Sequence, residues 1–184
     1  MDSLFTSTMT VALAEIGDKT QLLALLLSIK FHNKTAIVIG ILVATLINHG
    51  LSAWLGLYIG NILSTDVTNW ILGGSFIAVG LWLLIPDKDE EVSGRFDKYG
   101  AFLATFILFF LAEIGDKTQI ATVLLAAQYQ SLWLVTAGTT LGMLIANMPI
   151  VFFGNRVMQK LPVKVVHLVA AALFCLIGIS ILFW

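Results

Sequence analysis

The sequence predicts an all-α integral membrane protein in which six transmembrane helices form two inverted three-helix repeats. The composition is the first reason: 59% of the 184 residues are apolar, 11% are charged, and the mean hydropathy is +0.96. A soluble domain has about 45–50% apolar and about 25% charged residues. The second reason is the length of the apolar stretches, and the third is a charged octapeptide that occurs twice inside them.

Each predicted span is a mainly apolar segment of about 20 residues or more, the length that carries a helix across the hydrocarbon core of a bilayer. The first and fourth spans each contain one copy of the octapeptide. The second and fifth each contain an asparagine near the centre, and the third and sixth share a glycine at equivalent positions. In chain order the spans are residues 4–29, 36–60, 67–86, 100–127, 132–154 and 163–184.

The longest polar stretch, Pro86–Lys98, separates two halves of three spans each. We therefore predict a first repeat over residues 1–86, a charged cytoplasmic linker over 87–99 and a second repeat over 100–184. An offset of 98 residues relates the halves and takes Gly80 to Gly178. Because three spans is an odd number, the second copy must enter the membrane from the opposite side. Such inverted repeats are common in secondary transporters, whose binding sites lie at the midplane where the repeats meet.

Lysine and arginine residues predict the orientation of the chain. Of the ten, Lys19 and Lys117 lie inside predicted spans, and the other eight all fall in loops on one side. These eight are Lys30, Lys34, Lys88, Arg95, Lys98, Arg156, Lys160 and Lys164. Basic loops of membrane proteins are cytoplasmic, so both termini are expected to be extracytoplasmic. The first residues include neither a basic region nor a small-residue cleavage site, so no signal peptide is expected.

The octapeptide Ala-Glu-Ile-Gly-Asp-Lys-Thr-Gln occurs at residues 14–21 and 112–119. A charged side chain costs about 2.5–3.5 kcal/mol at the centre of a bilayer on insertion scales, so ionisable residues inside spans usually mark a functional site. On a continuous helix Glu15 and Asp18 would share a face, and Lys19 would reach Glu15 one turn away. The glycine of each copy would either loosen the helix or let another helix pack closely. Ion pairs that merely hold the spans together are the structural alternative.

Two copies that face each other carry a net charge of −2, because each copy has two carboxylates and one ammonium group. One divalent cation or two protons would neutralise such a site, which could therefore exchange one for the other. The candidate ligands are the four carboxylates, those of Glu15, Asp18, Glu113 and Asp116. The auxiliary residues, with hydroxyl or amide oxygens or an ammonium group, are Thr20, Thr118, Gln21, Gln119, Lys19 and Lys117. Oxygen ligands suit Ca²⁺ and Mn²⁺, whereas Zn²⁺ and copper favour imidazole and thiolate.

Polar residues also lie near the centres of the second and fifth spans. Asn48 and Asn147 occupy related positions and either line the site or form hydrogen bonds between helices. His49 has Met148 as its counterpart, which excludes a symmetric ligand role. A hydrogen-bonded interior histidine is the simpler interpretation of His49, and a proton relay is the alternative.

The two Glu-x-Gly-Asp-Lys-Thr motifs, in two three-span halves, resemble the family of Golgi calcium/manganese–proton exchangers and bacterial manganese exporters. The resemblance covers the whole chain. It implies cation/proton antiport, with the acidic residues of both motifs as the cation site and no cofactor beyond the transported ion. The compact size resembles that of the bacterial members. This implies export of Mn²⁺, with Ca²⁺ as the other candidate, across a bacterial inner membrane.

Two other classes of function are compatible with the sequence. A passive divalent-cation channel would use the same ligands. A membrane enzyme would need a nucleophile, a phosphate-binding loop or a soluble active-site domain, and the sequence displays none of these, so we expect a transporter. Its expected partners are the metal ion, protons and the lipid bilayer; a net charge of −1 gives no reason to expect a nucleic acid, and a homo-oligomer is compatible with the sequence.

Overall fold

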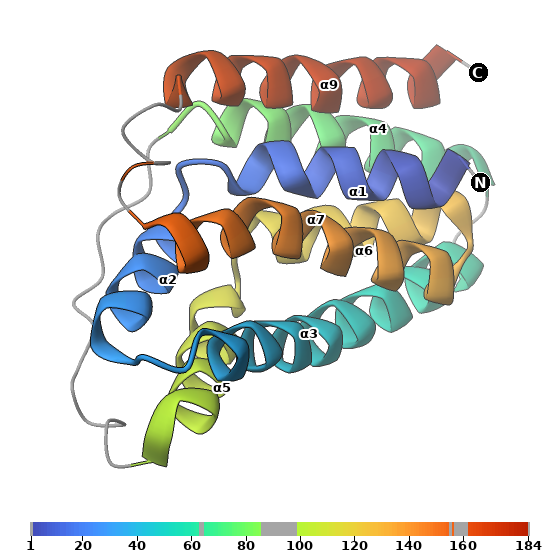
Figure 1. Ribbon diagram of the computed structural model, residues 1–184. Coiled ribbons are helices and arrows are strands. Elements are labelled where there is room, and N and C mark those ends of the chain that lie inside the picture. Colours follow the sequence, from blue (N-terminus) through green and yellow to red (C-terminus); the bar gives the residue numbers. More distant parts are fainter. Residues whose placement is uncertain (1, 63–64, 86–98, 155, 157–161, 184) are drawn as a thin grey trace.

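The computed structural model describes residues 2–62, 65–85, 99–154, 156 and 162–183, which are helical apart from short turns (Figure 1). No strand occurs among them. The first half contains α1 (Asp2–Glu15), α2 (Lys19–Lys30), α3 (Lys34–Ile62) and α4 (Thr65–Trp82). The second half contains α5 (Gly100–Glu113), α6 (Lys117–Tyr129), α7 (Leu132–Phe153) and α9 (Val163–Phe183). The predicted all-α class is confirmed for this part of the chain, whereas the linker predicted over 87–99 lies, apart from its last residue, outside the described residues.

Two of the predicted spans are not continuous helices. The spans predicted over 4–29 and 100–127 each break inside the octapeptide, so that α1 and α2, and likewise α5 and α6, are separate helices. The prediction that the glutamate and aspartate of each motif share a helix face is therefore wrong. The glycine of each motif explains the break. Gly17 has φ +86° and Gly115 has φ +74°, a left-handed conformation that only glycine adopts readily.

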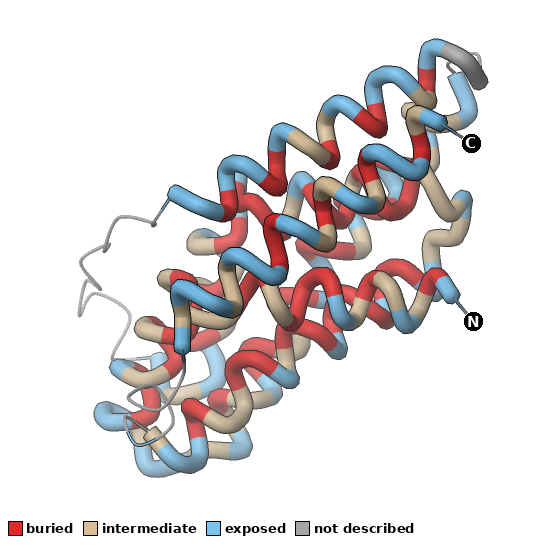
Figure 2. Tube along the Cα trace, turned by 90° about the horizontal axis from the view of Figure 1, so that it is seen from above, coloured by how far each residue is buried: buried red, intermediate tan, exposed pale blue. Residues whose placement is uncertain are grey.

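The outer surface of the helices is suited to lipid. α3, α7 and α9 are each long and apolar enough to cross a membrane, while the apolar parts of α4 and α5 are shorter. Residues on the outside of the bundle are widely exposed (Figure 2), and they include large apolar side chains such as Trp70, Trp133 and Phe183, which are 71%, 80% and 81% exposed. A soluble monomer rarely exposes extended apolar surface, so these faces are expected to contact the bilayer.

The two halves interlock. α1 packs mainly against α7, α5 packs mainly against α3, and α4 lies beside α9 (Figure 1). Contacts between helices of the same half are much less extensive, and they are chiefly those of α2 with α3 and of α6 with α7. Most of the packing of the described helices therefore lies between the two halves of the chain rather than within either half.

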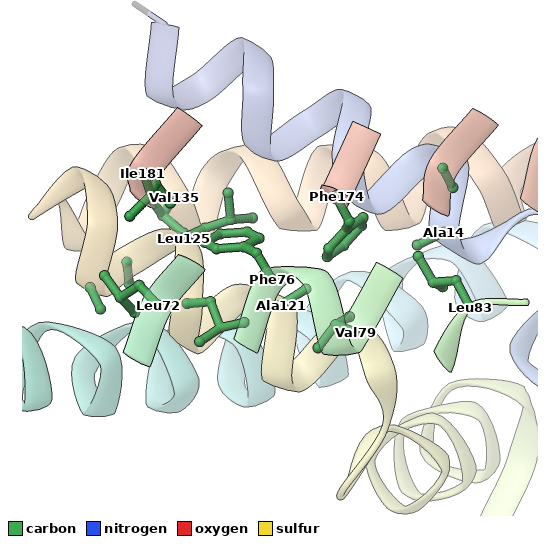
Figure 3. Close-up of a cluster of buried hydrophobic side chains, with 14 of the residues drawn as sticks. Ala14, Leu72, Phe76, Val79, Leu83, Ala121, Leu125, Val135, Phe174 and Ile181 are labelled. Carbon is green, nitrogen blue, oxygen red and sulfur yellow. The ribbon is translucent and has the colours of Figure 1, made fainter. Parts of the chain in front are cut away.

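An apolar cluster joins α4 and α9 to α6 and α7 (Figure 3). The rings of Phe76 and Phe174 meet at its centre with their centroids 6.0 Å apart. Gly80 and Gly178, which the repeat relates, lie where α4 and α9 approach each other, and a Cβ on either would press against the backbone of the opposite helix. The absence of side chains at these positions thus lets the two helices pack closely.

We expect Gly56→Ala to destabilise the protein, because a Cβ at this position would collide with the carbonyl oxygen of Val123 on α6. Overpacking of this kind typically costs about 1–3 kcal/mol. Gly74→Ala is the matched control, since a Cβ there meets no atom within 4 Å. Thermal unfolding in detergent should show a lower midpoint for Gly56→Ala and an unchanged or slightly higher one for Gly74→Ala. Equal midpoints would contradict the close approach of α3 and α6.

Candidate metal centre

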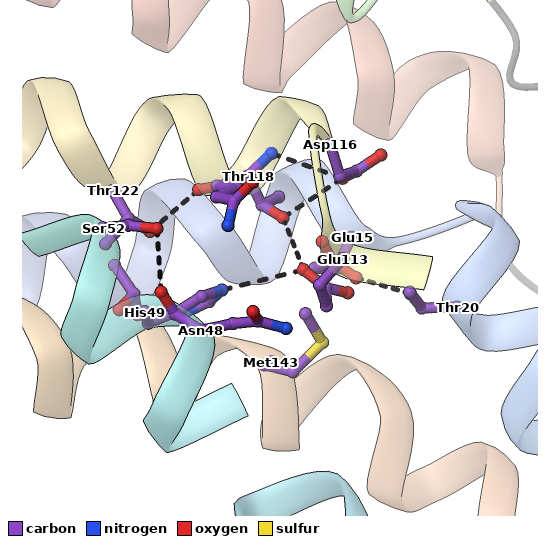
Figure 4. A network of polar contacts seen from close by, with 12 residues as sticks. Glu15, Thr20, Asn48, His49, Ser52, Glu113, Asp116, Thr118, Thr122 and Met143 are labelled. Atoms are coloured by element: carbon purple, nitrogen blue, oxygen red, sulfur yellow. Dashed lines mark hydrogen bonds and ion pairs between the residues drawn. The ribbon is translucent and has the colours of Figure 1, made fainter. Parts of the chain in front are cut away.

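Three of the four predicted carboxylates meet where the two helix breaks come together (Figure 4). Oxygen atoms of Glu15, Glu113 and Asp116 all lie within 4.8 Å of one another. Glu15 ends α1, Glu113 ends α5, and Asp116 directly precedes α6. Both glutamates are fully buried, and Asp116 is 5% exposed. Each half of the chain thus contributes at least one carboxylate to the cluster.

A threonine of the same motif holds one oxygen of each glutamate. Thr20 Oγ1 donates to Glu15 Oε2 at 2.6 Å, and Thr118 Oγ1 donates to Glu113 Oε2 at 3.2 Å (Figure 4). The Oε1 atom of each glutamate is buried without a hydrogen-bond partner. The threonines therefore fix the glutamates in orientation. The Oε1 atom of each is left free for a cation, and each Oε2, with one hydrogen bond, keeps a second lone pair.

Asp18, the fourth predicted carboxylate, lies outside the group of three. Both aspartates directly precede a helix and have extended backbone conformations. Asp116 caps α6, because its Oδ2 accepts from Thr118 N at 3.3 Å; Oδ2 also lies 3.2 Å from Thr118 Oγ1, whose one hydroxyl proton it shares with Glu113 Oε2. Asp18 makes no side-chain cap on α2, and its buried Oδ2 has no hydrogen-bond partner. Identical octapeptides are therefore arranged differently in the two halves.

The two lysines also have different surroundings. Lys19 Nζ lies 3.4 Å from Asp116 Oδ1, so this ion pair joins the halves. It replaces the expected pairing of Lys19 with Glu15 along one helix, because the break separates those two residues. Lys117 Nζ donates to the carbonyl oxygen of Ile85, just past α4, at 2.9 Å and lies 5.9 Å from the centroid of the Trp82 ring.

Gln21 and Gln119 stabilise the helix breaks. Backbone that leaves helical geometry inside a membrane must find partners for its polar groups. Gln21 Oε1 accepts from Gly17 N at 2.9 Å, and Gln119 Oε1 accepts from Gly115 N at 2.6 Å. Gln21 also donates through Nε2 to the carbonyl oxygen of Ala146 on α7, at 2.8 Å. The side-chain oxygens of Gln21 and Gln119, which the sequence suggested as auxiliary ligands, therefore accept hydrogen bonds from the backbone.

The two asparagines bind backbone carbonyl groups. Asn48 Nδ2 donates to Phe110 O on α5 at 3.0 Å and so links two helices. Asn147 Nδ2 donates to Met143 O at 3.1 Å, one turn earlier in its own helix. The buried Oδ1 of Asn147 has no hydrogen-bond partner. Only Asn48 therefore forms the interhelical hydrogen bond considered from the sequence.

His49 is an interior histidine, as the simpler interpretation of the sequence expected, but its contact is with the carboxylate cluster. The ring is fully buried on α3, and neither nitrogen meets the geometry of a hydrogen bond. Nε2 lies 3.7 Å from Glu113 Oε2 (Figure 4). One feature of the sequence indicates that His49 is unusual. It is an ionisable residue near the centre of a predicted span, next to Asn48, and the other half has no histidine at the related position.

The donor set of the cluster suits a hard divalent cation. Carboxylate oxygens are the usual protein ligands of Ca²⁺, Mg²⁺ and Mn²⁺. A structural ion pair would balance its charges, whereas the three carboxylates, if all were ionised, and the contacting Lys19 would together carry −2. Burial of uncompensated charge is costly. One divalent ion bound by the three carboxylates would remove this imbalance.

Comparison with known proteins identifies relatives along the whole chain. The profile of the family described as "Divalent cation/proton antiporter GDT1" matches residues 3–91 and 101–184. A Vibrio cholerae protein named "Putative manganese exporter" is 49% identical over 188 residues, covering 100% of this chain and 92% of that protein. "GDT1-like protein 3" of Oryza sativa subsp. indica is 29% identical over 209 residues, covering 100% of this chain and 74% of that protein. No solved structure matches the chain.

We expect Lys19→Met to bind a divalent cation such as Mn²⁺ roughly tenfold or more tightly than the wild type, because loss of the ammonium group beside Asp116 makes the cluster more negative. Release of the ion should slow in parallel. Lys19→Arg keeps the charge and should bind with nearly wild-type affinity. Titration of the purified protein, with free Mn²⁺ read by electron paramagnetic resonance, measures both variants. Weaker binding by a folded Lys19→Met protein would show instead that the lysine organises the carboxylates.

Proposed function

The chain belongs to the GDT1 family of divalent cation/proton antiporters, and we propose that it exports Mn²⁺ from the cytoplasm in exchange for H⁺. The observation that carries the proposal is the buried cluster of Glu15, Glu113 and Asp116, which carries −2 together with Lys19. The 49% identity to a Vibrio cholerae protein named "Putative manganese exporter" supports Mn²⁺ as the substrate. Ca²⁺ is the alternative, since it uses the same oxygen ligands.

In the proposed topology the chain crosses the membrane six times as two inverted repeats. α1 with α2, and α5 with α6, would each form one broken span, a feature that recurs at the binding sites of secondary transporters. The equivalent helices α3 and α7 run in opposite directions, and both ends of the described chain lie at one end of the molecule, which supports this arrangement (Figure 1). The junction of α2 and α3 lies at the opposite end of the molecule (Figure 1). Lys30 ends α2 and Lys34 begins α3, so the positive-inside rule assigns this end to the cytoplasm.

The difference between the two halves supports alternating access. α1 packs against α9, but α5, the counterpart of α1, makes no comparable contact with α4 among the described residues. A Cβ at Gly17 would collide with Val163 of α9, and the Ile16 carbonyl oxygen next to it lies 2.7 Å from His167 Nε2. A Cβ at Gly115 would meet no atom within 4 Å. Among the described residues, one break is thus covered by α9 while the space beside Gly115 in the other is open, as expected of one state of a carrier that alternates.

Proton exchange follows from the charge of the cluster. Three carboxylates so close together in a buried site repel one another, so they resist being ionised together when no cation is bound. Two protons would cancel the charge of −2 and let the cation-free carrier reorient. A cation that arrives from the cytoplasm would displace these protons. The cycle we propose therefore exchanges one divalent ion for two protons.

An imposed pH gradient distinguishes this antiporter from a passive channel. We expect proteoliposomes with an acidic lumen, at clamped membrane potential, to accumulate Mn²⁺ above its external concentration. Collapse of the pH gradient with nigericin should release the accumulated ion. A channel would only equalise Mn²⁺ across the membrane, and such equilibration would contradict the proposal. The same assay with Ca²⁺ decides between the two substrates.

We expect Glu15→Gln and Glu113→Gln each to abolish most of this uptake in a folded protein, because each replaces a charged ligand by a neutral amide. Asp2→Asn is the matched control, since Asp2 is an exposed carboxylate at the start of α1. Asp18→Asn should also lose uptake, because Asp18 would take the place of Asp116 in the opposite state of the carrier. Full uptake by both glutamine variants would remove the site from these motifs.

A further inference from the structure

His49 places an imidazole in the protein interior with no hydrogen bond to either nitrogen, and Nε2 contacts only the Glu113 carboxylate among the described polar groups. The ring is fully buried, and neither Nδ1 nor Nε2 has a hydrogen-bond partner. A buried polar group without a partner costs about 1–3 kcal/mol, and an apolar side chain of similar size would avoid this cost. His49 lies on α3, which packs against α5, α6 and α7, and therefore faces the helices that carry the cluster.

The separation between His49 and Glu113 is informative. Nε2 lies 3.7 Å from Glu113 Oε2, which is longer than a hydrogen bond of about 2.7–3.2 Å. Metal–ligand bonds in proteins are about 2.0–2.6 Å long, so two donor atoms on one ion commonly lie about 3–4 Å apart. The observed distance is that of an ion pair if the imidazole is protonated, and it is equally the separation of two ligands on one ion.

Resting on the proposed function, we propose that His49 Nε2 is a further ligand of the transported ion, which it binds together with Glu113. His49 is not part of the group of three carboxylates. It contacts that group at one member, Glu113. His49 and Asp116 approach Glu113 from different sides (Figure 4). Glu113 is then the ligand that the cluster and the imidazole share, and an ion bound to both Glu113 and His49 lies on the α3 side of the cluster.

A nitrogen ligand changes the preference of an otherwise all-oxygen site. Ca²⁺ is bound in proteins by oxygen ligands, whereas first-row transition-metal ions also accept imidazole. His49 therefore favours Mn²⁺ over Ca²⁺. The second half carries Met148 at the related position, so the two halves supply a single imidazole here. One imidazole among carboxylates discriminates against Ca²⁺ without creating the nitrogen-rich site that Zn²⁺ prefers.

Electron spin-echo envelope modulation of Mn²⁺ bound to the purified full-length protein tests this directly, because a coordinated imidazole gives a ¹⁴N modulation. We expect the modulation in the wild type and its loss in His49→Gln. The chain has three histidines, His32, His49 and His167. The double variant His32→Gln/His167→Gln keeps only His49 and should retain the modulation, so the test holds even if His49→Gln fails to fold.

Affinity measurements separate ligation from a merely structural role. We expect His49→Gln to weaken Mn²⁺ binding by about tenfold or more and Ca²⁺ binding by less than about twofold. Thr118→Val is the matched comparison, since it removes the hydroxyl group that contacts Glu113 Oε2 and Asp116 Oδ2 but no nitrogen ligand, and it should affect both ions alike. His32→Gln changes an exposed histidine and should leave both affinities unchanged.

Absence of ¹⁴N modulation from wild-type protein with bound Mn²⁺ would overturn the assignment of His49. Equal weakening of Mn²⁺ and Ca²⁺ binding in His49→Gln would do the same. If Glu113→Gln still abolished Mn²⁺ binding in either case, the proposed function would stand without His49. A wild-type protein that binds no Mn²⁺ would overturn both proposals.

Discussion

Backbone that leaves helical geometry inside a bilayer has no water to satisfy its polar groups, and the two breaks in the octapeptides meet this constraint in the same way. The amide oxygens of Gln21 and Gln119 accept from Gly17 N and Gly115 N. Each break also creates two helix ends. The N-terminus of α6, which carries a partial positive charge, is capped by the carboxylate of Asp116. On two continuous helices the motif side chains would point along helix faces. The breaks instead bring carboxylates from both halves within 4.8 Å of one another.

The packing between the two halves holds the carboxylate cluster in place, and in the proposed cycle it also allows the two halves to move relative to each other. α4 and α9 pack closely because glycines lie at their contact. The carboxylate cluster lies at the two helix breaks, and the adjoining helices α1 and α6 contact α9 and α4 respectively. Lys19 joins the halves through Asp116, so the contact that offsets one carboxylate also couples the halves. Asp18 and Asp116 have the same sequence context but different partners. Motion that exchanged their surroundings would carry the site from one side of the membrane to the other without any new residue.

The sequence predicts much of this arrangement because its strongest features are compositional. Apolar length predicts the helices, and the doubled motif predicts that Glu15, Glu113 and Asp116 matter. It does not predict the helix breaks, because a single glycine is tolerated in many membrane helices and its φ depends on the packing around it. The octapeptides are identical, so the presence of Asp116 and not Asp18 in the cluster depends on long-range packing, which differs between the halves, for example in the contact of α9 with the first break. His49 was undervalued because it has no counterpart in the repeat, whereas its distance to Glu113 depends on the packing of α3 against α5.

The number of protons released when the purified protein binds one Mn²⁺ tests the account most directly, because the claim is that protons and the cation compete for the same carboxylate oxygens. Titration in weakly buffered solution near neutral pH gives this number, and repetition across pH gives the dependence of affinity on protons. We predict release of two protons per ion and an affinity for Mn²⁺ that falls as the pH is lowered. Binding without proton release, with affinity constant across mildly acidic to mildly basic pH, would contradict proton-coupled exchange at this site.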